Sequence, residues 1–269
     1  MEDKMLSCAI KAAILAGQDI LNIYNDPDAD FEIESKADNS PLTIADKRSN
    51  ERIMSFLKDT PYPILSEEGK HMDYEVRQAW DTLWIVDPLD GTKEFIKKNG
   101  EFTVNIALVE KAVPVSGVIY VPVTRELYFA SYTIGAYKME QATIADADLP
   151  LDELIKKSRK LPLPQPEKND FVVVASRSHL SPETADYIHR LETEHKNIRT
   201  ISSGSSLKIC RVAEGRADIY PRFAPTMEWD TAAGHAIARA AGKNIYHTDE
   251  TTPLSYNKKD LLNPWFIVK

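Results

Sequence analysis

The chain has 269 residues, of which 43% are hydrophobic and 28% are charged, a composition that excludes a largely disordered protein. Its 33 basic and 41 acidic side chains give a formal net charge of −8, so binding of long nucleic acid is not expected. A small phosphorylated ligand is compatible with this charge if a cation neutralises it, and the length predicts one large domain or two small ones.

The first half of the chain predicts two helices followed by strands. Apolar residues at spacings of three and four predict a helix from Leu6 to Tyr24, in which Gly17 would let a neighbouring element approach closely. Thr43 and Asp46 have the spacing of a helix cap and its acidic third residue, and they predict a second helix. Apolar runs predict strands at 64–65, 83–86, 102–109, 113–121 and 127–130. The short connection between 109 and 113 predicts an antiparallel hairpin.

The proline-rich residues 161–166 predict a stiff, extended connection. We place there the boundary between an N-terminal α+β subdomain, residues 1–165, with an antiparallel sheet and most of the metal ligands, and a C-terminal α/β subdomain, residues 166–269, that closes the site. Beyond it the sequence predicts strands at 171–175, 198–201 and 217–220, and helices beginning at Ser181, Ser205 and Asp230. This alternation predicts a layered α/β architecture.

The two cysteines, Cys8 and Cys210, match no C-x-x-C or zinc-ligand pattern, so we expect two free, buried thiols in a reducing compartment. No signal peptide is recognisable, and no apolar run approaches the roughly 18 residues that span a bilayer. We therefore expect a cytoplasmic protein. Peripheral attachment to the cytoplasmic face of the inner membrane and the oligomeric state stay open.

Carboxylates stand at the ends of regular elements in three segments, where a rigid scaffold can aim them. These segments are Ser66-Glu67-Glu68-Gly69, Asp87-Pro88-Leu89-Asp90-Gly91-Thr92 and Glu228-Trp229-Asp230-Thr231.

The second segment combines metal-ligand chemistry with a phosphate-binding backbone. Pro88 stiffens the turn, so that the Asp87 and Asp90 carboxylates and the Leu89 carbonyl can point at one place. Hard oxygen ligands of this kind suit Mg²⁺, and crowded carboxylates need such a cation because they repel one another. Gly91 allows close backbone approach, and Thr92 opens a predicted helical turn whose free N–H groups form an anion site.

Structural interpretations compete with each of these assignments. The D-P-x-D-G string is also typical of a plain turn, and Glu67 and Glu68 alone would suit a solvated loop. Asp230, Thr92 and Asp46 are all residue types that cap helices, and for Asp46 a capping role and a catalytic role stay equally open. The coincidence of three acidic segments favours function, with Glu68 outside the set of direct ligands.

Other chemistries find no support in the sequence. The six histidines lack zinc-hydrolase spacing and are predicted to be structural or exposed, with His235 facing the core. The chain contains no G-x-S-x-G elbow and no glycine-rich nucleotide loop, so a serine hydrolase or a P-loop protein is not indicated.

The three acidic segments, the third extended to Trp229–Gly234, resemble the signatures of the lithium-sensitive, Mg²⁺-dependent inositol monophosphatase superfamily. Strings at 36–41, 91–96, 99–107, 204–208 and 220–223 resemble its bacterial 3′(2′),5′-bisphosphate nucleotidase branch. The resemblance covers about residues 5–268 and is weakest between 138 and 170. It implies a layered α-β-α-β-α sandwich of the sugar-phosphatase type.

The resemblance also implies roles for individual residues. Two Mg²⁺ ions would be held by Glu67, Asp87, the Leu89 carbonyl, Asp90 and Asp230. Catalysis would fall to Glu67, Thr92 and Asp46, of which Asp46 would place the water or a weaker third ion. The substrate would contact Glu67, Leu89, Asp90, Gly91, Thr92, Ser205, Ser206, Lys208, Arg222 and Asp230, with Arg222 at the 5′-phosphate.

The reaction implied by the resemblance is two-metal hydrolysis of adenosine 3′,5′-bisphosphate to AMP and phosphate, in sulfur assimilation. Its sulfated relative, 3′-phosphoadenylyl sulfate, is a second expected substrate. The alternatives are a phosphatase of the same fold acting on inositol monophosphate or fructose 1,6-bisphosphate, and a catalytically silent binding protein. The intact acidic residues argue against the silent protein.

Overall fold

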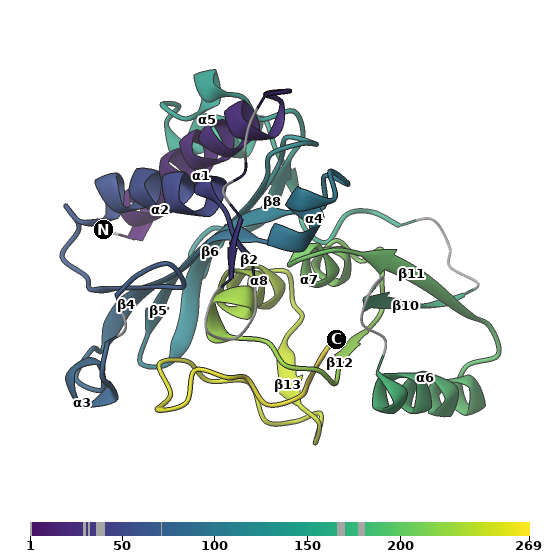
Figure 1. Ribbon diagram of the computed structural model, residues 1–269. Coiled ribbons are helices and arrows are strands. Elements are labelled where there is room, and N and C mark those ends of the chain that lie inside the picture. The colour runs from purple at the N-terminus through teal and green to yellow at the C-terminus, as the bar shows by residue number, and fades with distance from the viewer. Residues whose placement is uncertain are drawn as a thin grey trace.

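The computed structural model describes residues 2–28, 31, 33–35, 41–70, 72–165, 170–176 and 181–269. Helices and sheets alternate in layers, as the sequence predicted (Figure 1). Helices α1 (Glu2–Tyr24) and α2 (Ile44–Leu57) cover one face of a large sheet, and α8 (Glu228–Ala240) lies on its other face. The fold places the first turn of α8 beside the end of the sheet that carries the second acidic segment.

The large sheet has seven strands in the order β3-β4-β5-β6-β7-β8-β9. Its strands are β3 (Ile64–Ser66), β4 (Thr82–Asp90), β5 (Thr103–Glu110), β6 (Val113–Val121), β7 (Glu126–Ser131), β8 (Gly135–Met139) and β9 (Arg159–Lys160). All neighbours are antiparallel except β3 and β4, which are parallel. The predicted hairpin is confirmed by the pairing of β5 with β6.

Strand β4 contributes side chains to the hydrophobic clusters on both faces of the sheet. Leu83 and Ile85 belong to the hydrophobic cluster on the α8 side, whereas Trp84 and Val86 belong to the cluster under α1 and α2. All four side chains are buried. Because both faces of the sheet are covered, the strand is a continuous apolar run rather than an alternating one.

Two glycines allow the layers to touch. A Cβ atom at Gly17 on α1 would lie 2.4 Å from the ring of Tyr120 on β6, which confirms the predicted close approach. A Cβ atom at Gly117, also on β6, would lie 2.4 Å from the carbonyl oxygen of Ala233. Helix α8 therefore rests directly on the backbone of the sheet, and this contact fixes the position of its first turn.

Helix α1 corrects one expectation. Residues Asp3–Tyr24 are long and apolar enough to pass a length-and-hydropathy test for a membrane span. Half of the most apolar window is buried inside the protein, where Leu6, Ile10, Ile14 and Ile20 pack in the core. Core packing therefore accounts for the apolar character of this helix.

The second half forms two small sheets. Strands β10 (Phe171–Ser176) and β11 (Ile198–Ser203) are parallel, and β12 (Tyr220–Arg222), β14 (Phe266–Val268) and β13 (Ile245–His247) form an antiparallel sheet in that order. A bridge between Val173 and Ile219 joins the two sheets. Helix α6 (Pro182–Glu194), capped by Ser181 as predicted, lies on the outside (Figure 1).

Several element boundaries differ from the prediction. Helix α7 (Leu207–Ala213) begins two residues late, because Ser205 has a φ of +46° and cannot lie in a right-handed helix. Strand β12 begins at Tyr220 instead of Ala217. The short elements β1 (Glu34–Ser35), β2 (Pro41–Leu42), α3 (Tyr74–Arg77), α4 (Thr92–Ile96), the 3₁₀ turn Ile144–Asp146 and α5 (Leu151–Lys156) complete the fold.

The proline-rich connection packs against the core. Leu161 and Leu163 are buried in the cluster on the α8 side, and the Leu163 N–H donates to the carbonyl of Glu214. The subdomain boundary near residue 165 stays a prediction, and Pro166 lies outside the described residues. Both cysteines are free thiols. Cys210 is buried as expected, whereas Cys8 on α1 is only half-buried.

Candidate active site

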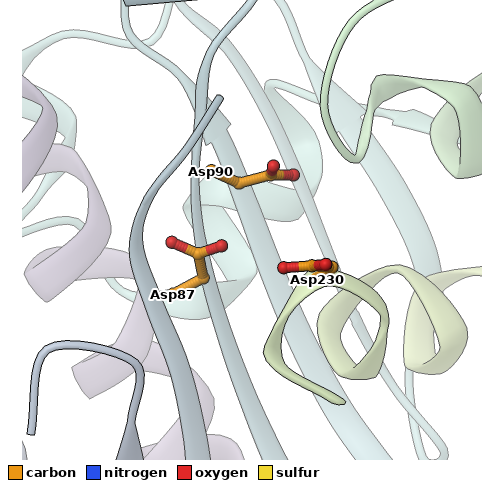
Figure 2. Close-up of side chains that lie close together, drawn as sticks. All are labelled: Asp87, Asp90 and Asp230. Atoms are coloured by element: carbon orange, nitrogen blue, oxygen red, sulfur yellow. The ribbon is translucent and has the colours of Figure 1, made fainter. Parts of the chain in front are cut away.

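Three aspartates from two elements meet at the centre of the molecule. Asp87 and Asp90 end β4, and Asp230 lies in the first turn of α8; their carboxylates face one another (Figure 2). Each offers an oxygen that lies within 4.8 Å of an oxygen from the other two. The predicted convergence of the second and third acidic segments is therefore seen in the fold.

A β-bulge brings Asp87 and Asp90 to the same side. In a regular strand, residues three apart point to opposite faces. Here Asp87 pairs with Asn105 and Asp90 with Thr103, so β4 holds one more residue than β5 between these pairs. The expected loop after Val86 is thus a bulged strand. The Leu89 N–H donates to the Asp87 carboxylate at 3.0 Å, and this bond holds the bulge.

Glu67 joins this cluster from β3. Its backbone N–H donates to the Val86 carbonyl at 3.1 Å, and its carboxyl group hydrogen-bonds to that of Asp87. The pairing of β3 with β4 thereby places the first acidic segment beside the second. The adjacent Glu68 stays outside the aspartate cluster among the described residues.

Burial and like charge act together on these acids. Burial, followed by the charges of Glu67, Asp90 and Asp230, raises the pKa of Asp87 well above its usual value. Burial, followed by the charge of Asp90, raises the pKa of Asp230 from 3.8 to about 8. Across the described part of the chain no lysine or arginine forms an ion pair with Asp87, Asp90 or Asp230. A divalent cation would supply the missing positive charge.

Asp46 caps α2, one of the two roles that the sequence left open, and it also contacts Thr92; its catalytic role stays a prediction. One carboxylate oxygen accepts from the Thr43 N–H at 2.7 Å and so caps α2. The other accepts a hydrogen bond from the Thr92 hydroxyl at 3.0 Å. The capping bond therefore fixes the orientation of the oxygen that receives Thr92. Gly91 caps α4 with a φ of +96°, so Thr92 is not the cap of that helix.

The two serines before α7 hold Asp90. The Ser205 hydroxyl lies 2.8 Å from the Asp90 carbonyl oxygen and 2.7 Å from that of Glu101. The Ser206 hydroxyl lies 2.6 Å from the Asp90 carboxylate. A Cβ atom at Gly91 would lie 2.2 Å from the Ser205 oxygen, so the segment needs glycine there. Direct contact of these serines with substrate stays a prediction.

An open pocket adjoins the carboxylates on the side of α7 and β12. It is lined by Asp90, Gly91, Lys93, Glu94, Ser203, Gly204, Ser205, Ser206, Lys208, Ile209, Tyr220, Arg222, Thr226, Asp230, Thr231 and Phe266. Seven of the residues predicted to form the site line this pocket or its acidic rim. Asp46, Glu67, Asp87, Leu89 and Thr92 lie outside this lining.

Two cations, Lys208 and Arg222, line the same pocket as Asp90 and Asp230. The Lys208 ammonium donates to the carbonyls of Ser205 at 2.8 Å and Ser203 at 3.3 Å and lies 5.7 Å from the Tyr220 ring centroid. Burial lowers the pKa of Lys208 from 10.5 to about 8. The Arg222 guanidinium donates to the Pro225 carbonyl, while its buried Nε has no partner among the described residues. Arg222 therefore lines the pocket with its guanidinium group, while its Nε is buried behind the pocket wall.

Some site residues were missed by the sequence analysis. Asn105, Tyr220, Thr226 and Phe266 lie in or beside the pocket. The sequence signal for Asn105 is a polar amide in the middle of an apolar run that predicts a strand. Glu228 opens the third segment but is buried against the N–H groups of 257 and 258, away from the other acids.

The histidine predictions are confirmed where the structure describes them. His235 is buried, bonds to Tyr256 and Asn244, and burial lowers its pKa to about 4. A neutral, fully bonded imidazole of this kind serves the core. His71, His179 and residues 36–40 lie outside the described part of the chain.

The family profile described as the inositol monophosphatase family matches residues 1–266. The chain belongs to this family, and it is a phosphatase. Membership agrees with a cluster of carboxylates at the meeting point of a sheet and a helix.

Named relatives are similar over their whole length. The Escherichia coli K12 protein named 3′(2′),5′-bisphosphate nucleotidase CysQ is 45% identical over 272 residues, which cover 98% of this chain and 99% of that protein. The crystal structure of CysQ from Bacteroides thetaiotaomicron matches with a TM-score of 0.92 and 62% identity, covering 99% of this chain and 97% of that one. An inositol monophosphatase from Anabaena matches with a TM-score of 0.70 and 25% identity, covering 99% and 90%. The predicted resemblance to the bacterial nucleotidase branch is confirmed.

The acidic cluster should make the metal-free protein sensitive to pH. A carboxyl whose pKa is raised by folding stabilises the fold below its unfolded pKa, and this contribution is lost as the pH rises through its folded pKa. For Asp230 that window runs from 3.8 to about 8. We expect the free energy of unfolding in EDTA to fall between pH 5 and pH 8, and MgCl₂ to restore it at pH 8.

Denaturant unfolding at both pH values, with and without MgCl₂, measures this effect. The Asp230→Asn variant is the control, because it keeps the side-chain volume and removes one charge. It should show a flatter pH dependence and a smaller response to MgCl₂. Identical curves for the two proteins would contradict the electrostatic account of the cluster.

Proposed function

We propose that this phosphatase is a Mg²⁺-dependent 3′(2′),5′-bisphosphate nucleotidase that converts adenosine 3′,5′-bisphosphate to AMP and phosphate. The observation that carries the proposal is the pair of cations, Lys208 and Arg222, in a pocket that opens onto the acidic cluster. One phosphate of the substrate would lie at the acids and the other at the cations. The names of the relatives support the same substrate.

The acidic cluster fits Mg²⁺ in both chemistry and charge. Its donors are carboxylate oxygens, the ligands that Mg²⁺ prefers, and burial together with like charge raises the pKa of Asp87 and Asp230. The ligands would be Glu67, Asp87, the Leu89 carbonyl, Asp90 and Asp230. When bound, the ions, which we propose to be two with a weaker third near Asp46, supply the positive charge that activates water and stabilises the leaving oxygen.

Thr92 and Asp46 would orient the attacking water. Because the Thr92 hydroxyl donates its only proton to Asp46, its lone pairs are free to accept a hydrogen bond from water. Glu67, beside Asp87, would accept the second proton of that water. The backbone of Gly91 and Thr92 would contact the phosphate oxygens. These groups supply position and charge, which is most of what phosphoryl transfer requires.

The second phosphate explains the two cations. Lys208 has used two of its three N–H donors on carbonyls, so the third can serve a ligand, and the Arg222 guanidinium lines the same pocket. A substrate with one phosphate would leave both groups unsatisfied inside the pocket, at a cost to binding. The aromatic rings of Tyr220 and Phe266 form the wall behind them.

The sulfated relative, 3′-phosphoadenylyl sulfate, carries the same 3′-phosphate and is a second proposed substrate. The proposed role is removal of adenosine 3′,5′-bisphosphate, a by-product of sulfate assimilation, in the cytoplasm. Inositol monophosphate is a second candidate substrate, because an inositol monophosphatase has the same fold. The two cations favour the bisphosphate.

Phosphate release from three substrates tests the proposal. Adenosine 3′,5′-bisphosphate, inositol 1-phosphate and fructose 1,6-bisphosphate are compared at equal concentration with MgCl₂, and the first should be hydrolysed fastest. Asp90→Asn should abolish turnover without unfolding the protein, because it removes a ligand charge. Faster hydrolysis of inositol 1-phosphate, or full activity of Asp90→Asn, would reject the proposal.

Arg222→Ala should raise KM for adenosine 3′,5′-bisphosphate about 10-fold to 100-fold, the usual value of a charge-assisted hydrogen bond. KM for inositol 1-phosphate should change little. Arg159→Ala is the matched control, because Arg159 forms an exposed ion pair with Glu140 far along the sheet. Equal effects of Arg222→Ala on both substrates would refute the role of the arginine.

Lys208 should give KM a pH dependence. Its pKa is lowered to about 8, so the ammonium is charged below that pH and loses its proton above it. We expect KM for the bisphosphate to rise between pH 7 and pH 9. Lys208→Met should show a high KM at every pH, since it never carries the charge. A steep rise that persists in Lys208→Met would assign the effect to another group.

A further inference from the structure

One of the proposed metal ligands, Asp90, is held by a chain of buried hydrogen bonds. The Thr103 hydroxyl donates to the Asn105 side-chain oxygen at 2.9 Å, and the Asn105 amide donates to the Ser206 hydroxyl oxygen at 2.8 Å. The Ser206 hydroxyl donates to the Asp90 carboxylate at 2.6 Å. The Asn105 amide also lies 3.4 Å from the same carboxylate oxygen.

The direction of this chain follows from the number of protons. The Ser206 hydroxyl has a single proton and lies near two acceptors, the Asp90 carboxylate at 2.6 Å and the Asp230 carbonyl at 2.9 Å. A charged acceptor forms the shorter and stronger bond, so the Ser206 hydroxyl donates its hydrogen bond to the Asp90 carboxylate. The Asn105 amide then supplies the hydrogen that the serine oxygen accepts. Each donor in the chain points toward the carboxylate, and such chains strengthen their members.

Burying the polar side chains of this hydrogen-bond chain costs free energy unless their polar atoms are bonded. Thr103, Asn105 and Ser206 are 0%, 1% and 3% exposed, and Asn105 lies in an otherwise apolar strand. An amide in that position is tolerated only when its polar atoms are bonded. Asn105 is also the strand partner of Asp87 across the β4–β5 ladder. Paired residues of an antiparallel ladder point to the same face, so the Asn105 side chain lies beside the acidic cluster, and Asn105 is not among the residues that line the pocket.

The Ser206 oxygen lies between two of the proposed ligands. It contacts the carboxylate of Asp90, which ends β4, and the backbone of Asp230, which opens α8. It also precedes α7, whose start carries Lys208. Three elements that are far apart in sequence therefore share one hydroxyl group.

We infer that Asn105 and Ser206 are positioning residues that orient the Asp90 carboxylate and set its separation from Asp230 for Mg²⁺ binding. This inference rests on the proposed metal-dependent function. Partners that orient a metal ligand without touching the metal commonly change metal affinity 10-fold to 100-fold when they are removed. Neither residue needs to contact the substrate for this effect.

Titration calorimetry with MgCl₂ alone, without substrate, tests the inference. Asn105→Leu removes the amide at similar volume, and Ser206→Ala removes a single oxygen atom. Each should weaken Mg²⁺ binding by about 10-fold or more, and the double variant should be less than additive because both act through one chain. In assays of Asn105→Leu, saturating Mg²⁺ should recover most of kcat, which a loss of fold would not allow.

Ser131→Ala is the matched control. Ser131 is a buried serine on β7 that bonds to Thr133, and it lies in a different part of the sheet. Thermal unfolding of each variant accompanies the titration, and Ser206→Ala decides the question if Asn105→Leu does not fold. Wild-type Mg²⁺ affinity in Ser206→Ala, or an equal loss in Ser131→Ala, would overturn the inference. Failure of the wild-type protein to bind Mg²⁺ would overturn the proposed function instead.

Discussion

The mutual repulsion of three clustered carboxylates, one buried and two half-buried, is the constraint on which the site depends. Asp87, Asp90 and Asp230 are brought together with no basic side chain paired to them in the described chain, so their encounter opposes folding unless a cation joins them. The cost is met by the rest of the architecture. The bulge in β4 turns two aspartates to one side, and the contact of α8 with Gly117 delivers the third.

The acidic and basic groups of the pocket come from different elements of the fold. The acids belong to the large sheet and to the helix on its face, whereas Lys208 and Arg222 come from α7 and the small sheet. Negative and positive groups are thus provided by separate elements and meet at one pocket. Substrate specificity can change through α7 and β12 while the acidic cluster is kept, which agrees with a family fold shared by an inositol monophosphatase and nucleotidases.

The sequence predicted the long elements and the acidic residues but not how the acids converge. The helix at Thr43 and the hairpin of β5 and β6 have strong local signals, a capping box and two apolar runs. The bulge at Pro88 has no such signal, because the same residues are typical of a turn. Asn105 could be found only by asking what a buried amide bonds to, and that answer lies in Ser206, distant in sequence. Short strands such as β9 depend on tertiary packing alone.

Ser205 combines an unfavourable backbone conformation with two favourable side-chain hydrogen bonds. Glycine would adopt its φ of +46° without steric penalty, yet the chain carries a residue that pays for that conformation. The return is a hydroxyl that fastens the segment before α7 to two carbonyls, those of Asp90 and Glu101. A glycine at this position would relieve the backbone strain. It would also remove the hydrogen bonds that join the segment before α7, which carries Lys208, to Asp90 of the acidic cluster. The position of α7 relative to β4 therefore depends on one residue with an unfavourable backbone conformation.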